Sequence, residues 1–157
     1  LKFGGHQAAA GLSMEKDKFE ALKEKFEKVV AEKIQEHQKF PSITIDSVIE
    51  IEDLNRDFFN FHRKLSPFGP HNMKPVLELR NQKVSGYVKQ MGKDGNHLKF
   101  YIHQPVSGRN IECIGFKLGQ YMDDFKTKNF DIAFTVEENH WKGNVTYYLN
   151  IRDVKFH

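Results

Sequence analysis

A short stretch rich in proline and glycine divides the sequence into two differently patterned parts. Pro67-Phe68-Gly69-Pro70 places two prolines and one glycine within four residues. Because proline fixes φ and lacks a backbone N–H, neither a helix nor a central strand can pass through this stretch. Apolar residues have helical spacing before it and strand spacing after it. The sequence therefore predicts an α+β fold.

Two helices are expected in the first part. Over residues 17–36 apolar side chains recur every three or four positions, with lysine and glutamate between them, so this helix is amphipathic. Its balanced charges are typical of a solvated face and carry no functional signal. A second helix is expected over 54–65, with Asp53 as its N-cap.

Six β-rich runs are expected, at residues 76–80, 83–90, 97–103, 110–116, 130–138 and 145–154. The last five form the main series, and a short helix is expected within 117–128, between the third and fourth of them. Five strands with a helix in that place are the oligonucleotide/oligosaccharide-binding (OB) arrangement. The complete prediction is an N-terminal amphipathic helix and a helical connector followed by a five-stranded OB-type β-barrel.

Composition limits the class of protein. The 157 residues are 39% hydrophobic and 13% aromatic, enough for a folded core, and the net charge of +3 is too small to indicate nucleic-acid binding by itself. The single cysteine, Cys113, lies in an apolar run and is expected as a buried thiol in a reducing compartment. No membrane span or secretory signal is apparent, so a cytoplasmic location is expected. The start at Leu1, on a glycine-rich turn, indicates part of a larger protein.

Strand alternation predicts which side chains face the core and which face solvent. The predicted core set is Val84, Gly86, Val88, Leu98, Phe100, Ile102, Phe130, Ile132, Phe134, Val136, Tyr147, Leu149 and Ile151. The outward set on the first two strands is Lys83, Ser85, Tyr87, Lys89, His97, Lys99, Tyr101 and His103.

Amines mixed with aromatic rings suit single-stranded nucleic acid, because ammonium groups offset phosphate charge and rings stack on unpaired bases. Residues 80–117 contain seven basic residues and only two acidic ones. The predicted nucleic-acid-binding residues are Lys83, Tyr87, Lys89, Lys99, Tyr101, Arg109 and Trp141. The alternative is that lysine and tyrosine are ordinary outward residues of a half-exposed strand. Trp141, expected in the last hairpin loop, could equally pack over a barrel end.

Gly4-Gly5-His6, followed by small residues up to Gly11, forms a second candidate site. Two glycines allow another chain or a phosphate to approach the backbone, and His6 could then donate a hydrogen bond. By itself, this tripeptide is more typical of a surface turn that carries a histidine.

Several motifs together resemble one family. The run GGHQAAAGLSM at 4–14 is similar to the end of the DHH-associated domain, and LSPFGPHNMKP at 65–75 resembles the LxPFGxGNxxP linker of RecJ-like exonucleases. HLK at 97–99, IGF at 114–116 and NHWKG at 139–143 are similar to motifs of the OB domain in the same family. His71 stands where that family usually has glycine, and Met73 where it often has proline.

The resemblance implies an organisation and a function. Residues 1–40 would be the end of a DHH-associated domain, 41–79 a connector, and 80–157 the OB domain of an exonuclease that degrades single-stranded DNA from the 5′ end in recombination and repair. Gly4, Gly5 and His6 would hold the substrate phosphate. The catalytic Mn or Mg would lie in an N-terminal DHH domain, because the histidines here show no metal-binding spacing. No cofactor and no activity are therefore expected for this chain alone.

The partners implied are single-stranded DNA, the DHH domain and a single-strand-binding protein, with no membrane. The alternatives left open are an OB-fold protein-docking module and an RNA-binding module, both without catalysis. Exposure of Tyr87 and Tyr101 would favour nucleic acid, whereas burial or pairing with carboxylates would favour docking.

Overall fold

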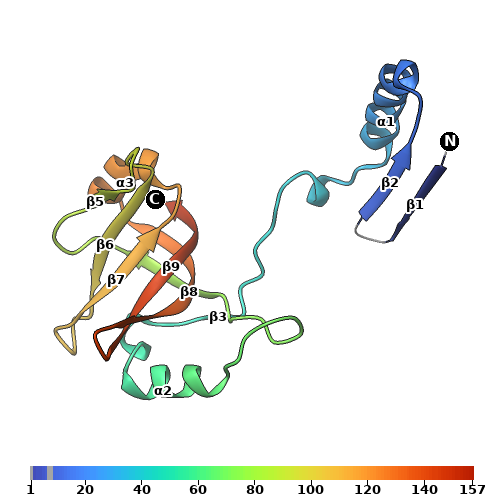
Figure 1. Cartoon of the computed structure of the whole chain (residues 1–157). Coiled ribbons are helices and arrows are strands. Elements are labelled where there is room, and N and C mark those ends of the chain that lie inside the picture. The colour runs from blue at the N-terminus through green and yellow to red at the C-terminus, as the bar shows by residue number, and fades with distance from the viewer. Residues whose placement is uncertain (1, 7–8) are drawn as a thin grey trace. The chain divides into compact units, whose positions relative to one another are not determined.

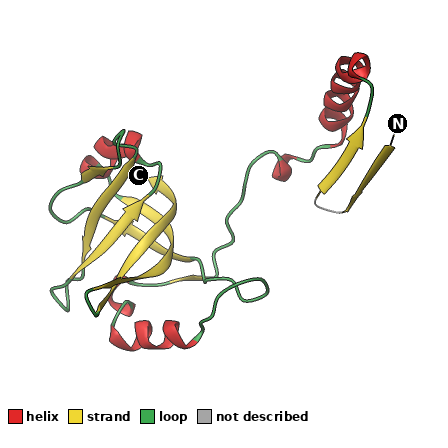
Figure 2. Ribbon diagram, viewed as in Figure 1, coloured by secondary structure: helices red, strands yellow, loops and turns green. Residues whose placement is uncertain are grey.

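The computed structural model describes residues 2–6 and 9–157, which divide into two units, Leu1–Ser42 and Ile43–His157. Each unit is coloured along the chain in Figure 1 and by secondary structure in Figure 2. In the described part of the chain, no helix has the length and apolar character needed to cross a membrane.

The first unit consists of a hairpin and a helix. Strands β1 (Lys2–His6) and β2 (Ala9–Ser13) pair antiparallel, and helix α1 (Phe19–Lys33) follows a single 3-10 turn, η1 (Lys16–Lys18). Another 3-10 turn, η2 (Glu36–Gln38), comes after α1. Helix α1 confirms the amphipathic helix expected over 17–36, although none of its residues is buried. Gly4 and Gly5, expected in a turn, instead lie in β1, and the residues that follow His6 in that motif, 7 and 8, lie outside the described residues.

The second unit is a barrel built on one mixed sheet. Its elements are β3 (Ser47–Val48), η3 (Ile51–Asp53), α2 (Arg56–Lys64), β4 (Leu77–Gln82), β5 (Lys89–Met91), β6 (His97–His103), β7 (Asn110–Gly115), η4 (Gly119–Tyr121), α3 (Met122–Thr127), β8 (Phe130–Trp141) and β9 (Asn144–Phe156). The strand order is β3-β4-β8-β9-β7-β6-β5, with β7 parallel to β9. Helix α3 lies between β7 and β8 in sequence, as expected. The predicted α+β fold with an OB-type barrel is confirmed.

The first strand of the OB barrel differs from its prediction. A continuous strand was expected over 83–90, but only Lys89–Met91 forms a strand in that stretch. Gly86 has φ of 81°, a left-handed conformation that interrupts the extended backbone, and it is exposed rather than in the core. The preceding strand β4, expected separately over 76–80, pairs with β8, and β5 pairs with β6. Residues 83–88 therefore carry the chain from β4, the second strand of the sheet order, to β5 at its far end.

The barrel core is aromatic and follows the predicted alternation closely. Phe100, Phe125 and Phe130 are at most 1% exposed, with ring centroids 4.6 to 5.8 Å apart. The inward residues expected on β6, β8 and β9 are buried, except that Tyr147 is only half-buried. Cys113 is buried as predicted, and this burial raises the pKa of its thiol well above the usual value. Val88 is buried, whereas Val84 is only partly buried.

Helix α2 packs against the barrel. Phe59 stacks on Tyr147 with ring centroids 4.3 Å apart, and Leu54 is 1% exposed. The side-chain amide of Gln104 donates to the Ile51 carbonyl oxygen at 2.6 Å, which joins this segment to the β6–β7 loop. Most of the stretch expected as a connector, 41–79, thus lies in the second unit.

The N-cap of α2 was predicted incorrectly. Asn55, not Asp53, is the cap, and its side chain accepts from the backbone N–H groups of Asp57 and Phe58 at 3.0 Å. Asp53 instead accepts from the backbone N–H of Glu50 at 2.9 Å, within the 3-10 turn before the helix. Asx residues compete for the same role, and the extra 3-10 turn moved the helix start by two residues.

Candidate nucleic-acid interface

Strands β9, β7, β6 and β5 are successive neighbours in the sheet (Figure 1). Their outward side chains, together with Glu137 of β8, are here named the outer face. The strand register places these side chains in two neighbouring rows. One row consists of Tyr101, Glu112, Tyr148 and Glu137. The other consists of Lys89, Lys99, Ile114 and Asn150. The centre of the outer face therefore alternates tyrosines with carboxylates, an arrangement that the sequence analysis did not predict.

Two of the predicted binding residues are held by a carboxylate. Lys99 Nζ lies 2.5 Å from Glu112 Oε2, and the hydroxyl of Tyr101 donates to the same oxygen at 3.2 Å. Lys99 Nζ also lies 5.8 Å from the centre of the Tyr101 ring. The hydrogen bond to Glu112 raises the pKa of Lys99. The charge of Lys99 is consequently balanced on the protein itself, which reduces what it offers to a phosphate.

Tyr148 belongs to the same surface but was absent from the predicted set. Burial raises the pKa of its phenol, and the nearby carboxylates of Glu137 and Glu112 add to this effect. Strand β9 was interpreted only for its inward residues, although the same alternation places Tyr148 outward. Applying that pattern to both faces would have identified it.

Three predicted residues are exposed at the edge of the outer face. Lys83, Tyr87 and Lys89 are exposed, and the Tyr87 side chain is 68% accessible. Among the residues that the structure describes, neither lysine has a carboxylate within ion-pair distance. The backbone N–H of Ser85 donates to the Tyr101 carbonyl oxygen at 2.7 Å, so the segment carrying Lys83 and Tyr87 lies beside β6.

The remaining two predicted residues lie toward the other end of the strands. Arg109 precedes β7 in the β6–β7 loop, next to Asn110, which pairs with His103. Trp141 is the last residue of β8 rather than a loop residue, and it is 68% exposed. Lys142 Nζ lies 5.8 Å from its ring centroid. Exposure of this kind does not match a tryptophan that packs over a barrel end.

The Gly4-Gly5-His6 motif lies in the first unit, on β1. A Cβ on Gly5 would lie 2.8 Å from the Ala9 carbonyl oxygen, so glycine is required here for the close approach of β2. A Cβ on Gly4 would meet nothing within 4 Å, and the side chain of His6 is exposed. The hairpin thus requires glycine at position 5, whereas Gly4 is not needed for packing and leaves its backbone accessible.

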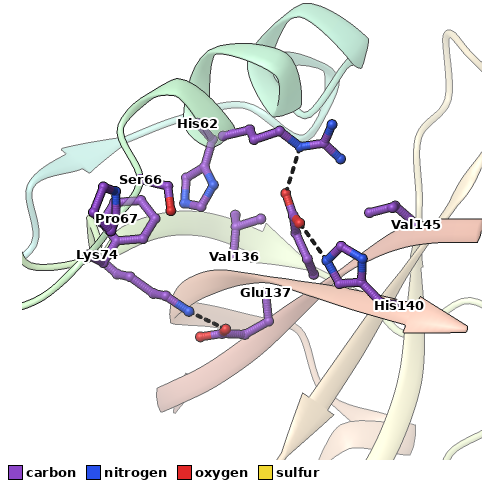
Figure 3. A pocket seen from close by; sticks show the side chains of 11 residues that line it. His62, Ser66, Pro67, Lys74, Val136, Glu137, His140 and Val145 are labelled. Carbon is purple, nitrogen blue, oxygen red and sulfur yellow. Dashed lines mark hydrogen bonds and ion pairs between the residues drawn. The ribbon is translucent and has the colours of Figure 1, made fainter.

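A charged pocket of about 660 Å³ lies between α2, the turn that follows it and the β8–β9 hairpin (Figure 3). Arg63 donates through Nε to Glu138 at 3.1 Å, and the other oxygen of Glu138 lies 2.8 Å from His140 Nε2. Lys74 pairs with Glu137 on the opposite side. Because both cations face carboxylates, the pocket offers a phosphate little net charge, and the outer face is the better candidate for nucleic acid.

His62 forms part of the pocket wall. Its side chain is 6% exposed between the rings of Phe58 and Phe68, whose centroids lie 6.2 and 5.1 Å away. Within the described residues, neither ring nitrogen has a hydrogen-bond partner. Burial lowers the pKa of His62, and the nearby charge of Lys74 lowers it further. The ring is therefore neutral at pH 7.

The side chains that the structure describes form no candidate metal site. Across residues 2–6 and 9–157, no three histidine, cysteine, aspartate or glutamate side chains lie together in a group that could hold an ion.

An OB-type barrel with exposed amines and aromatic rings on its outer face defines the class of this protein as an OB-fold domain with a candidate nucleic-acid interface. The family profile described as "RecJ OB domain" matches residues 45–153, and the chain belongs to this family. The resemblance inferred from the sequence motifs is confirmed.

Relatives and solved structures agree with this assignment. The chain is 26% identical over 152 residues to "Single-stranded-DNA-specific exonuclease RecJ" of Bacillus subtilis strain 168, covering 96% of this chain and 19% of that protein. It is 24% identical over 159 residues to the protein of the same name in Escherichia coli K12, covering 98% and 26%. The crystal structure of RecJ in complex with Mn²⁺ from Thermus thermophilus shares the fold, with a TM-score of 0.68 at 24% identity over 99% of this chain and 22% of that one. This chain thus spans about a fifth to a quarter of the length of these proteins.

Proposed function

We propose that this chain is the substrate-binding C-terminal part of a single-strand-specific exonuclease that degrades DNA in the 5′ to 3′ direction during recombination and repair. The observation that carries the proposal is the exposed set Lys83, Tyr87 and Lys89 at the outer face of a RecJ-type OB domain. The relatives from Bacillus subtilis and Escherichia coli are single-stranded-DNA-specific exonucleases, which supports both the polymer and the reaction.

Binding to this surface follows from ordinary physical chemistry. The unpaired ammonium groups of Lys83 and Lys89 release counterions when they contact phosphates, and the Tyr87 ring can stack on any base. Stacking requires a base whose face is uncovered, so a duplex offers this surface much less. The same chemistry would hold single-stranded RNA, and the 2′-hydroxyl is what would distinguish the two polymers.

The remaining functions are assigned by family. Gly4, with its open backbone, together with Gly5 and His6, would hold the substrate phosphate. Mn or Mg would bind in a DHH domain elsewhere in the protein, so this chain alone would not hydrolyse DNA. A cytoplasmic location and a single-strand-binding protein as partner belong to the same proposal.

One observation favours a different function, a protein-docking surface. Lys99 and Tyr101 are both engaged by the Glu112 carboxylate, as expected for residues that take part in protein contacts. The exposed rings of Tyr87 and Trp141 favour nucleic acid instead. The proposal follows the exposed residues, because exposed groups are the ones available to a strand.

The proposal is tested by fluorescence anisotropy of this chain with labelled oligodeoxythymidine at several salt concentrations. Lys89→Ala should weaken binding and reduce the slope of log K against log salt by about 0.7, the value for one phosphate contact. Tyr87→Ala should cost about 1 to 3 kcal/mol with little change in slope. Lys99→Ala should have a smaller effect on the slope than Lys89→Ala, because Lys99 is paired with Glu112.

Lys64→Ala is the control, since Lys64 is exposed on α2 and lies outside the outer face. It should leave affinity and slope nearly unchanged. If the unmodified chain does not bind the oligonucleotide, the nucleic-acid proposal fails and docking becomes the better interpretation.

A further inference from the structure

Phe116 is a half-exposed aromatic residue that the candidate set above does not include. It follows the last residue of β7, Gly115, and 52% of its surface is accessible. Leu118 packs inward instead, because a Cβ on Gly115 would lie 2.7 Å from Leu118 Cδ1 and only glycine leaves the space. The turn therefore uses Leu118 for the core and leaves the ring of Phe116 at the surface.

The Phe116 ring has a fixed neighbour in His97. The two ring centroids lie 5.2 Å apart at an interplanar angle of 67°, an edge-to-face contact. His97 is itself oriented, because its Nδ1 accepts from the backbone N–H of Lys117 at 3.0 Å. On another side, a Cβ at Gly92 would lie 3.1 Å from His97 Cδ2, which leaves the imidazole little room to turn. The hydrogen bond also requires that the proton of neutral His97 is on Nε2.

The β5–β6 loop is hydrogen-bonded to the turn that follows Phe116. The backbone N–H of Gly119 donates to the Asn96 carbonyl oxygen at 3.0 Å, and a Cβ on Gly119 would overlap the Gly95 carbonyl oxygen. The loop closes on itself through a hydrogen bond from Gly95 N–H to the Gly92 carbonyl oxygen at 3.3 Å. The surroundings of Phe116 are thus held by main-chain contacts, and the ring is arranged before any ligand arrives.

Lysines flank this ring. Lys117 comes directly after it, and Lys93 lies in the β5–β6 loop, next to Asp94 in the sequence. Lys89 begins the adjoining strand β5. Taking only residues with described positions, Lys89, Lys93 and Lys117 have no ion-pair partner. An exposed ring surrounded by net positive charge suits a polymer that combines flat rings with an anionic backbone.

We propose that Phe116, oriented by His97, is a stacking platform for one unpaired nucleobase, with Lys117 and Lys89 contacting the adjoining phosphates. This inference rests on the proposed function, and it adds a base position at the end of the outer face where β7 meets the β5–β6 loop. A preformed ring loses little conformational freedom on binding, so the contact contributes strongly for a single side chain. A duplex cannot use the platform, because its bases are stacked on one another.

The test measures binding of this chain to oligodeoxythymidine by anisotropy with two variants of Phe116. Phe116→Leu keeps an apolar side chain but removes the ring, and it should weaken binding about 5- to 100-fold with an unchanged salt slope. Phe116→Trp keeps a ring and should bind within about threefold of the unmodified chain. Val106→Ala, at an exposed apolar residue of the β6–β7 loop, is the matched control and should have no effect. Thermal unfolding of each variant separates lost binding from lost folding.

A direct contact is checked with an oligonucleotide that carries one 5-iodouracil, irradiated in complex with the unmodified chain. Cross-linking to the peptide that contains Phe116 supports the platform. Binding that is unaffected in Phe116→Leu, or cross-links only at other peptides, overturns it while leaving the proposed function intact. Absence of any binding by the unmodified chain overturns the proposed function as well.

Discussion

The two units of the molecule differ in how far their apolar side chains are buried. In the first unit, Phe19 and Phe26 of α1 are 54% and 65% exposed, and within its described residues no side chain is buried. In the second unit, Phe100, Phe130 and Phe134 are completely buried. Both sequences have a regular apolar pattern, so a pattern alone shows that a face is apolar and not what covers it. Within the part of the chain that the structure describes, the core cluster lies in the barrel unit.

The largest expected effect tests this contrast by truncating one phenylalanine in each unit. Phe100→Ala should lower the free energy of unfolding of the barrel by about 3 to 5 kcal/mol, because it removes a buried ring and leaves a cavity. Phe26→Ala should change it by less than about 0.5 kcal/mol, because that ring is largely exposed. Urea unfolding followed by the fluorescence of Trp141, the single tryptophan and a residue of the second unit, measures both.

This prediction would be contradicted if Phe26→Ala lowered the free energy of unfolding of the barrel as much as Phe100→Ala. That outcome would mean that α1 contributes to the stability of the barrel. Circular dichroism at 222 nm on the same samples would show whether α1 itself remains folded.

The elements that could be predicted are those with an uninterrupted pattern. Strands β6, β8 and β9 followed simple alternation, and their inward residues were identified from the sequence. The strand expected over 83–90 failed at Gly86, because glycine was counted as a small core residue and not as a residue free to adopt positive φ. Asn55 was missed as a cap because Asp53 is an equally good candidate and only the extra 3-10 turn decides between them.

The outer face shows where sequence reasoning reaches its limit. Alternation placed Lys99 and Tyr101 outward, but their common contact with Glu112 depends on the register between β6 and β7. Register is set by turns and by packing, and it cannot be derived from one strand alone. The exposure of Phe116 likewise depends on the turn that directs Leu118 inward. Single residues were therefore predictable, and their partners were not.

His62 provides a second prediction, of intermediate size, inside the second unit. Its pKa is lowered in the folded state, chiefly by burial, so at pH values below about 6.5 the unfolded chain binds a proton that the folded chain resists. Above that pH, His62 is neutral in both states and the free energy of unfolding does not depend on it. As the pH falls toward the folded-state pKa, protonation of the unfolded chain lowers the free energy of unfolding. Urea unfolding at pH 8 and at pH 5.5 should therefore show a weaker barrel at the lower pH.

His62→Phe keeps a ring of similar size and removes two nitrogens that have no partner among the described residues. It should raise the free energy of unfolding by about 1 to 3 kcal/mol at neutral pH. It should also reduce the decrease in the free energy of unfolding between pH 8 and pH 5.5. Burial acts to raise the pKa of Glu138, but the hydrogen bonds from Arg63 and His140 outweigh it and lower that pKa, so Glu138 does not account for a loss of stability between pH 8 and pH 5.5. An equal pH dependence in His62→Phe would assign the loss to another group.

The smallest expected effect concerns the turn that joins α2 to β4. His71 has φ of 66°, in the left-handed region where a Cβ is unfavourable, and Gly69 and Asn72 bridge across it with backbone hydrogen bonds of 2.9 and 3.0 Å. The RecJ-like linker motif has glycine at this position, which fits the conformation observed. His71→Gly should relieve the strain and raise the free energy of unfolding by about 0.5 to 1 kcal/mol, partly offset by the extra freedom of glycine in the unfolded chain.

His71→Ala is the matched control for this prediction, because it removes the same imidazole and keeps the Cβ. The difference between the two variants in urea unfolding isolates the backbone strain from any contact of the His71 side chain. If the turn belongs to the cooperative unit of the barrel, the gain of His71→Gly over His71→Ala should appear as a shift in the transition that Trp141 reports, with an unchanged denaturant slope. If both variants unfold at the same denaturant concentration, the positive φ of His71 stores no strain that the unfolding of the barrel releases.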